Sequence, residues 1–99
     1  MDPFGKIQES VPQAELLALL AEEAVELAHA ALKLRRVYDG TNPTPVKGAT
    51  AFANLKEELA DVWLVVSVLG YDRHRPEIVR IQSEKLKRWL QRLEEEVPT

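Results

Sequence analysis

A chain of 99 residues with 45% hydrophobic side chains forms one globular domain, close to the lower size limit for a self-sufficient core, which favours a partner subunit. The sequence has no cysteine, which excludes a disulfide framework and a thiolate zinc site, so a metal must take oxygen or imidazole ligands. A net charge of −3 provides neither the basic field of a protein that binds nucleic acid polymers nor the acidic excess of a disordered chain.

The sequence also lacks the patterns of membrane and secreted proteins. Its longest apolar run, residues 62–69 with Ser67 inside it, is far shorter than the roughly 20 residues of a membrane helix. The N-terminus has no charged-then-apolar signal pattern. We therefore expect a cytoplasmic protein that makes no membrane contact.

The first expected helix follows an N-terminal tail. Residues 1–9 contain Pro3 and Gly5 and show no periodicity, so we expect a flexible tail there and a helical domain over residues 10–99. Ser10, with proline and glutamine just after it, predicts a helix start. One apolar stripe then runs to about residue 38, where Asp39-Gly40 ends the helix. The stripe consists of Leu16, Leu20, Leu27, Ala31 and Leu34.

Two further helices are expected after a turn-rich connection over residues 39–48, which holds Asn42-Pro43 and Thr44-Pro45. The second helix covers about residues 50–70, and its C-terminal half is apolar on all sides and must be covered on more than one of them. A short polar link leads to Pro76, which opens the third helix, expected to end near residue 96. Its expected buried face consists of Ile78, Leu86, Trp89, Leu90 and Leu93.

No strand pattern occurs in the sequence, so the expected fold class is all-α. We do not expect packing of the three main helices within one chain to cover helices of this length fully. We therefore expect a helical bundle that is completed by oligomerisation, as a homodimer or homotetramer.

Two acidic motifs lie on the first and second expected helices. In the first, Glu23 lies inside the apolar stripe and Glu26 at its edge, whereas in the second Glu58 and Asp61 border the buried face. Each pair is spaced by three residues, so its members share a helix face. Because a short connection makes the two helices antiparallel neighbours, the pairs can meet near the middle of the bundle. The alternative is that these acids are solvated surface groups balanced by nearby lysines.

The burial cost of a carboxylate favours a bound cation over that alternative. Carboxylates without thiolates suit Mg²⁺ or Mn²⁺ better than zinc or copper. Glu26 and His29 form a Glu-x-x-His, which is half of a di-iron carboxylate signature. The second helix lacks the other half, and His29 faces about 60° away from Glu26, so we expect His29 to be a surface residue.

Basic side chains form a row beside the expected buried face of the third helix. Lys85, Arg88 and Arg92 follow one another at three- and four-residue steps. Lys33 lies about two turns beyond Glu26 on a similar side of its helix. Together these four residues are candidates to bind a polyphosphate. The alternative is that they pair with the acids of the C-terminal segment.

In these motifs the chain resembles the MazG-type, all-α nucleoside triphosphate pyrophosphohydrolases. The resemblance runs from Ala21-Glu22-Glu23-Ala24-Val25-Glu26-Leu27 through residues 55–62 to Lys85-Leu86-Lys87-Arg88-Trp89. Carried over, it implies Glu23, Glu26, Glu58 and Asp61 as Mg²⁺ ligands and Lys85 and Arg88 as phosphate contacts. The chain departs from the family in a longer gap between the motifs, and in having Gln82 and Ser83 where an asparagine is often found.

The resemblance implies hydrolysis of a nucleoside triphosphate to the monophosphate and pyrophosphate, with non-standard or surplus deoxynucleotides as substrates. Glu22 or Glu57 would orient the attacking water or accept its proton. Two alternatives stay open: phosphoribosyl-ATP pyrophosphohydrolase, which uses similar acids, and a non-catalytic helical dimerisation or regulatory module. A nucleic acid polymer is not expected as a partner.

Overall fold

The structure is a computed structural model that describes residues 2–41 and 47–96. The described part consists of helices and short connections and contains no strand, so the predicted all-α class is confirmed. Four α-helices follow one another: α1 (Pro3–Ser10), α2 (Gln13–Asp39), α3 (Gly48–Val68) and α4 (Arg75–Glu96), with a 3₁₀ turn, η1 (Tyr71–His74), before α4. The middle of the expected turn-rich connection, residues 42–46, lies outside the described residues.

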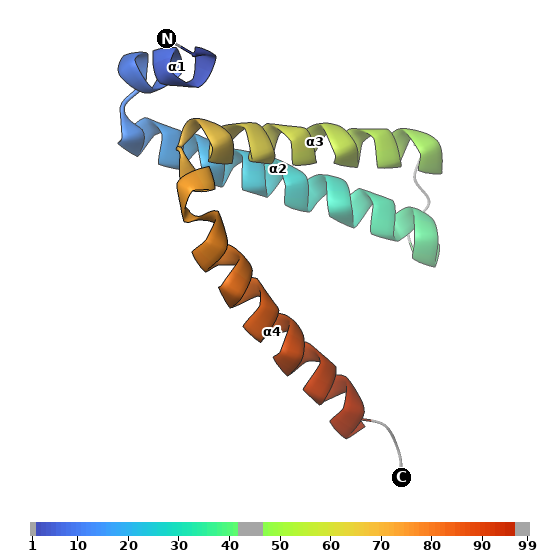
Figure 1. Cartoon of the computed structure of the whole chain (residues 1–99). Helices are drawn as coiled ribbons and strands as arrows, with labels where there is room; N and C mark the ends of the chain where they lie inside the picture. Colours follow the sequence, from blue (N-terminus) through green and yellow to red (C-terminus); the bar gives the residue numbers. More distant parts are fainter. Residues whose placement is uncertain (1, 42–46, 97–99) are drawn as a thin grey trace.

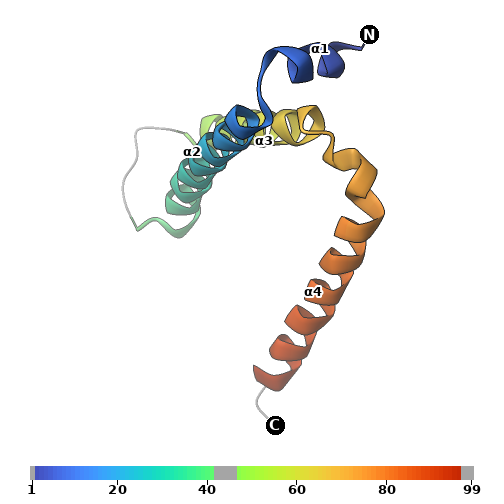
Figure 2. The same cartoon turned by 90° about the vertical axis from the view of Figure 1, so that its left-hand side faces the viewer.

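Helices α2 and α3 form an antiparallel hairpin and lie side by side in both views (Figures 1 and 2). Two groups of buried side chains join them. Near the start of α2, Leu16 packs with Val65, Val68 and Leu69, and Val11, Leu20 and Tyr71 cover this group in part. Towards the other end of the hairpin, Ala30, Leu34 and Ala51 are buried. This packing fixes the relative position of the two helices along most of their length.

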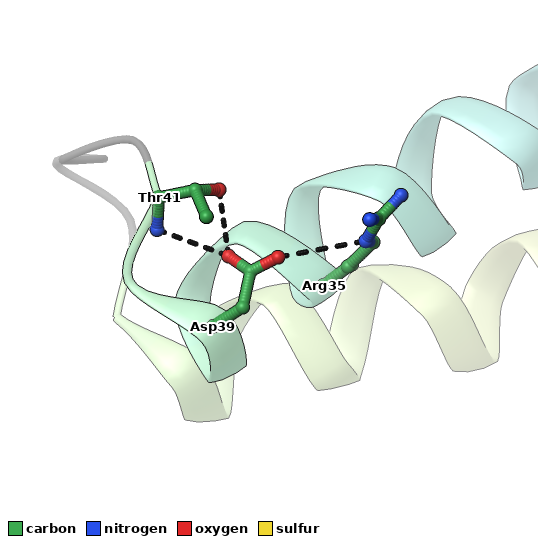
Figure 3. Close-up of polar contacts among 3 residues, drawn as sticks. All are labelled: Arg35, Asp39 and Thr41. Carbon is green, nitrogen blue, oxygen red and sulfur yellow. Dashed lines mark hydrogen bonds and ion pairs between the residues drawn. The ribbon is translucent and has the colours of Figure 1, made fainter.

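The C-terminus of α2 has a well-defined cap. Gly40 has a φ of 64° and donates its N–H to the carbonyl of Arg36, an arrangement that glycine adopts without strain. The Asp39 carboxylate accepts hydrogen bonds from the Thr41 N–H at 3.0 Å and from its hydroxyl at 2.7 Å, and pairs with Arg35 at 3.5 Å (Figure 3). These contacts, led by the Thr41 hydroxyl, lower the pKa of Asp39. The predicted stop at Asp39-Gly40 thus coincides with the observed helix end.

The N-terminal segment differs from the expected flexible tail, because residues 3–10 form α1. Asp2 caps this helix by accepting the Gly5 N–H at 2.8 Å, and Pro3 fits its first turn. Gln8 donates a hydrogen bond of 2.6 Å to the Val68 carbonyl and so ties α1 to the end of α3. Ser10 does not cap α2, since its hydroxyl donates to the Lys6 carbonyl.

Helix α4 diverges from the hairpin, as both views show (Figures 1 and 2). It follows Gly70, which has a φ of 79°, and packs against η1 at its N-terminal end. All 22 residues of α4 are described and none is buried. The buried face expected for this helix is therefore exposed within a single chain. Completion of the bundle by a second copy stays a prediction.

Within residues 2–41 and 47–96, no helix combines the length and the apolar character needed to cross a bilayer.

Candidate metal centre

The hairpin carries both acidic motifs on the same side. Glu23 and Glu26 are one turn apart on α2, and Glu58 and Asp61 are one turn apart on α3. Antiparallel packing brings the two turns together, because each lies partway along its helix. The structure thus unites the four acids that the sequence indicates as metal ligands.

The four carboxylates are close enough to share one ion. Each offers an oxygen such that all four oxygens lie within 4.8 Å of one another. Glu23 and Glu58 are half-buried at the helix interface, whereas Glu26 and Asp61 are exposed. The group is therefore embedded on one side and open to solvent on the other, an arrangement that leaves room for ligands that do not come from the protein.

Two oxygens in this group have no hydrogen-bond partner among residues 2–41 and 47–96. The Oε2 atoms of Glu23 and Glu58 are buried and accept no hydrogen bond. Buried polar atoms in proteins almost always have a partner, so each exception calls for an explanation, such as a role in binding a cation. Among the described residues, the ion pairs join Arg35 to Asp39 and Arg80 to Glu84, so neither involves the group.

The pKa values of the two half-buried glutamates are consistent with this clustering of carboxylates. Burial, followed by the charges of Glu26 and Asp61, raises the pKa of Glu23 above its usual 4.5. The same causes in the same order raise the pKa of Glu58. Both shifts mean that the site disfavours the charged carboxylate as long as no cation is present. A divalent cation would reverse this preference.

The donor set fits a hard divalent cation. Four carboxylates without thiolate or imidazole suit Mg²⁺, Mn²⁺ or Ca²⁺, and none of these is singled out by the donor types alone. His29 is exposed on α2 and is not part of the group. The observed donors therefore lack the imidazole of a di-iron Glu-x-x-His pair.

Glu22 and Glu57, the two acids expected to act on water, flank the group. Both are exposed, and each directly precedes one of the half-buried glutamates. One residue along a helix corresponds to a rotation of about 100°, so their side chains leave the helices in a different direction from those of the group. The structure places them beside the centre and not within it.

The basic residues are not gathered around the centre within one chain. Lys33 is exposed on α2, about 10 Å along the helix from Glu26. Lys85, Arg88 and Arg92 are exposed on α4, which leads away from the hairpin (Figure 1). With Trp89 they border a groove of about 750 Å³ whose walls all come from α4. A groove lined by one helix is an open surface and not an enclosed binding site.

Sequence reasoning identified every acid of the group. Among the described residues, the cluster that could hold a metal consists of these four acids and has no fifth protein ligand. What the sequence did not reveal is which oxygens lack partners, because that depends on how deeply each side chain enters the hairpin interface. A signal was nevertheless present in the position of Glu23 within the apolar stripe of its helix.

Comparison of the chain with protein-family models, with curated proteins and with solved structures gives no match.

Proposed function

We propose that the chain is a Mg²⁺-dependent nucleoside triphosphate pyrophosphohydrolase of the MazG type, which acts in the cytoplasm as a homo-oligomer. It would release the nucleoside monophosphate and pyrophosphate, and non-standard or surplus deoxynucleotides are the substrates we favour. The observation that carries the proposal is the four-carboxylate group, in which two buried oxygens have no partner in the described part of the chain. The motif resemblance and the oxygen-only donor set support it.

Glu23, Glu26, Glu58 and Asp61 would hold the cation, with Mn²⁺ as an alternative to Mg²⁺. Bound there, a divalent ion would supply neutralisation of phosphate charge and activation of water. The half-buried pair, Glu23 and Glu58, sets the depth of the site, and the exposed pair, Glu26 and Asp61, lies on its open side. A triphosphate would therefore approach from the solvent side of the hairpin.

The exposed acids Glu22 and Glu57 are the proposed groups for handling the attacking water. A carboxylate beside the centre would orient the water and take up its proton as the bond between two phosphoryl groups breaks. The proposed phosphate contacts are Lys33 on α2 and the basic row of α4. Their positive charge would stabilise the leaving pyrophosphate.

The proposal is tested by pyrophosphate release from a panel of ribo- and deoxynucleoside triphosphates, including modified bases. Each substrate is assayed with millimolar Mg²⁺ and with excess chelator. We expect release that requires the metal. If no triphosphate is cleaved, phosphoribosyl-ATP is tested next. Inactivity on both, together with a melting temperature that does not respond to Mg²⁺, would support a non-catalytic helical module instead.

A further inference from the structure

Helix α4 presents an apolar face that stays exposed in the part of the chain that the structure describes. Five large side chains lie within an arc of about 120° on this helix. Their exposed fractions are about half or more, with Trp89 at 59% and Leu86 at 55%. We call this set the α4 face: Ile78, Leu86, Trp89, Leu90 and Leu93. A helix with such a face is stabilised mainly by packing and needs a partner surface.

The chain exposes more surface than a compact monomer of the same mass. The structure exposes 8091 Å², whereas a compact monomer of 11.2 kDa exposes about 5,700 Å². Its radius of gyration is 17.9 Å, against about 13 Å for a compact domain of this length. If each of two subunits buried this excess of about 2,400 Å², the dimer would bury about 4,800 Å² in total, which lies at the upper end of the roughly 2,000–5,000 Å² of obligate homodimers.

The hairpin has a matching uncovered surface on α3. Phe52, Leu59, Trp63 and Val66 lie within about 60° of one another on the helix wheel. Phe52 and Trp63 are 45% and 67% exposed, and Leu59 and Val66 are half-buried. We call this set the α3 face. Trp63 lies about 160° around the helix from Asp61, so a partner on this face would leave the acidic group open.

We propose that two copies of this chain exchange their α4 helices, so that the α4 face of each copy packs on the α3 face of the other. One chain carries both an uncovered helix and an uncovered acceptor, and a two-fold dimer satisfies both with two identical contacts. Pairing of α4 with α4 would leave Phe52 and Trp63 exposed. Pairing of the two α3 faces would leave the α4 face exposed.

This inference rests on the homo-oligomeric part of the proposed function and is independent of hydrolysis. It is tested by measuring molecular mass with light scattering after gel filtration. Wild type should have twice the chain mass of 11.2 kDa. Trp89→Glu and Trp63→Glu should each give monomers. Two matched controls should remain dimers. They are Gln91→Glu, on the far side of α4, and Ala53→Glu, outside the α3 face.

Mixing the two monomeric variants distinguishes exchange from other dimers. A mixed dimer joins an intact α4 face to an intact α3 face at one of its two contacts, so we expect dimers to reappear on mixing. Dimers of Trp63→Glu alone, or of Trp89→Glu alone, would overturn the exchange while the oligomeric proposal stands. A monomeric wild type would overturn both, and pyrophosphate release would still decide the catalytic proposal.

A second experiment avoids variants that fold poorly. The chain has no cysteine, so Leu90→Cys on α4 and Leu59→Cys on α3 each introduce a single thiol. The two proteins are mixed and treated with a flexible bifunctional thiol reagent. We expect the product that joins one Leu90→Cys chain to one Leu59→Cys chain in excess over either homodimeric product. A random mixture of products, or no cross-linked product, would overturn the exchange.

Discussion

Glu23 and Glu58 come from different helices, yet each presents a carboxylate oxygen to the same group, within 4.8 Å of the others, and each has a buried Oε2 atom without a partner among the described residues. In both residues, burial is the largest cause of the raised pKa, and the charges of the neighbouring acids are the next largest. The hairpin thus holds two like charges at its interface. Such an arrangement is tolerable when a cation offsets the charge, and this gives several testable consequences.

Replacing Glu58 with glutamine should remove the rise in melting temperature that Mg²⁺ causes in wild type. In wild type, an ion that binds only the folded state at a hundredfold excess over its dissociation constant adds about 2.7 kcal/mol to the free energy of unfolding. For a chain of this size, that raises the melting temperature by roughly 10 °C or more. Differential scanning fluorimetry with and without Mg²⁺ measures the shift. Glu95→Gln, on the exposed end of α4, is the control and should respond like wild type.

Without metal, the contribution of Glu23 and Glu58 to stability should fall as the pH rises. The pKa values of Glu23 and Glu58 are raised above 4.5 in the folded state, so their favourable contribution is present below pH 4.5 and is lost as the pH rises through the raised values. With chelator, the melting temperature of wild type should therefore fall relative to that of Glu58→Gln as the pH rises from 4.5 towards neutrality. Parallel curves for the two proteins would contradict the raised pKa values.

The contribution of Asp39 to stability should change with pH in the opposite direction. Its pKa is lowered below 3.8 by the Thr41 and Arg35 contacts, so its contribution is present above pH 3.8 and is lost as the pH falls through the lowered value. Thr41→Val removes the hydroxyl donor and keeps the N–H donor. Carboxyl titration by NMR should show a higher pKa for Asp39 in this variant. An unchanged value would mean that the hydroxyl bond does not hold the carboxylate.

The C-terminus of α2 should tolerate asparagine better than alanine. Gly40 has a positive φ, and a Cβ there would meet no atom within 4 Å, so the cost of alanine is purely conformational. We expect Gly40→Ala to lower the free energy of unfolding by about 1–2 kcal/mol. Gly40→Asn should cost less, because asparagine visits this region more readily. Equal melting temperatures for the two variants would argue against the left-handed cap.

Helix α1 should depend on the bond from Gln8 to the Val68 carbonyl. Gln8→Ala removes the donor, at a net cost of about 1 kcal/mol. Hydrogen exchange should accelerate over residues 3–10 and change little in α2. The control Glu9→Ala alters a neighbouring exposed residue of α1 and should leave exchange unchanged. Equal exchange in both variants would show that another contact holds α1.

Some parts of this structure follow from local sequence patterns and others do not. The hairpin and its acidic group follow from helical periodicity, the Gly40 stop and the three-residue spacing within each acidic pair. Helix α1 was missed because it is short, and its position depends on the distant contact between Gln8 and Val68. Periodicity predicted which residues of α4 are apolar but not what covers them, since that depends on the backbone at Gly70 and on surfaces outside the helix.

The most direct test of the proposed hydrolysis follows the products by ³¹P NMR. A deoxynucleoside triphosphate is incubated with Mg²⁺ and either wild type or Glu58→Gln, with chelated wild type alongside. We expect resonances of the monophosphate and pyrophosphate only in the sample that contains wild type and free Mg²⁺. Formation of diphosphate and inorganic phosphate, or equal turnover by Glu58→Gln, would contradict a pyrophosphohydrolase that depends on this carboxylate group.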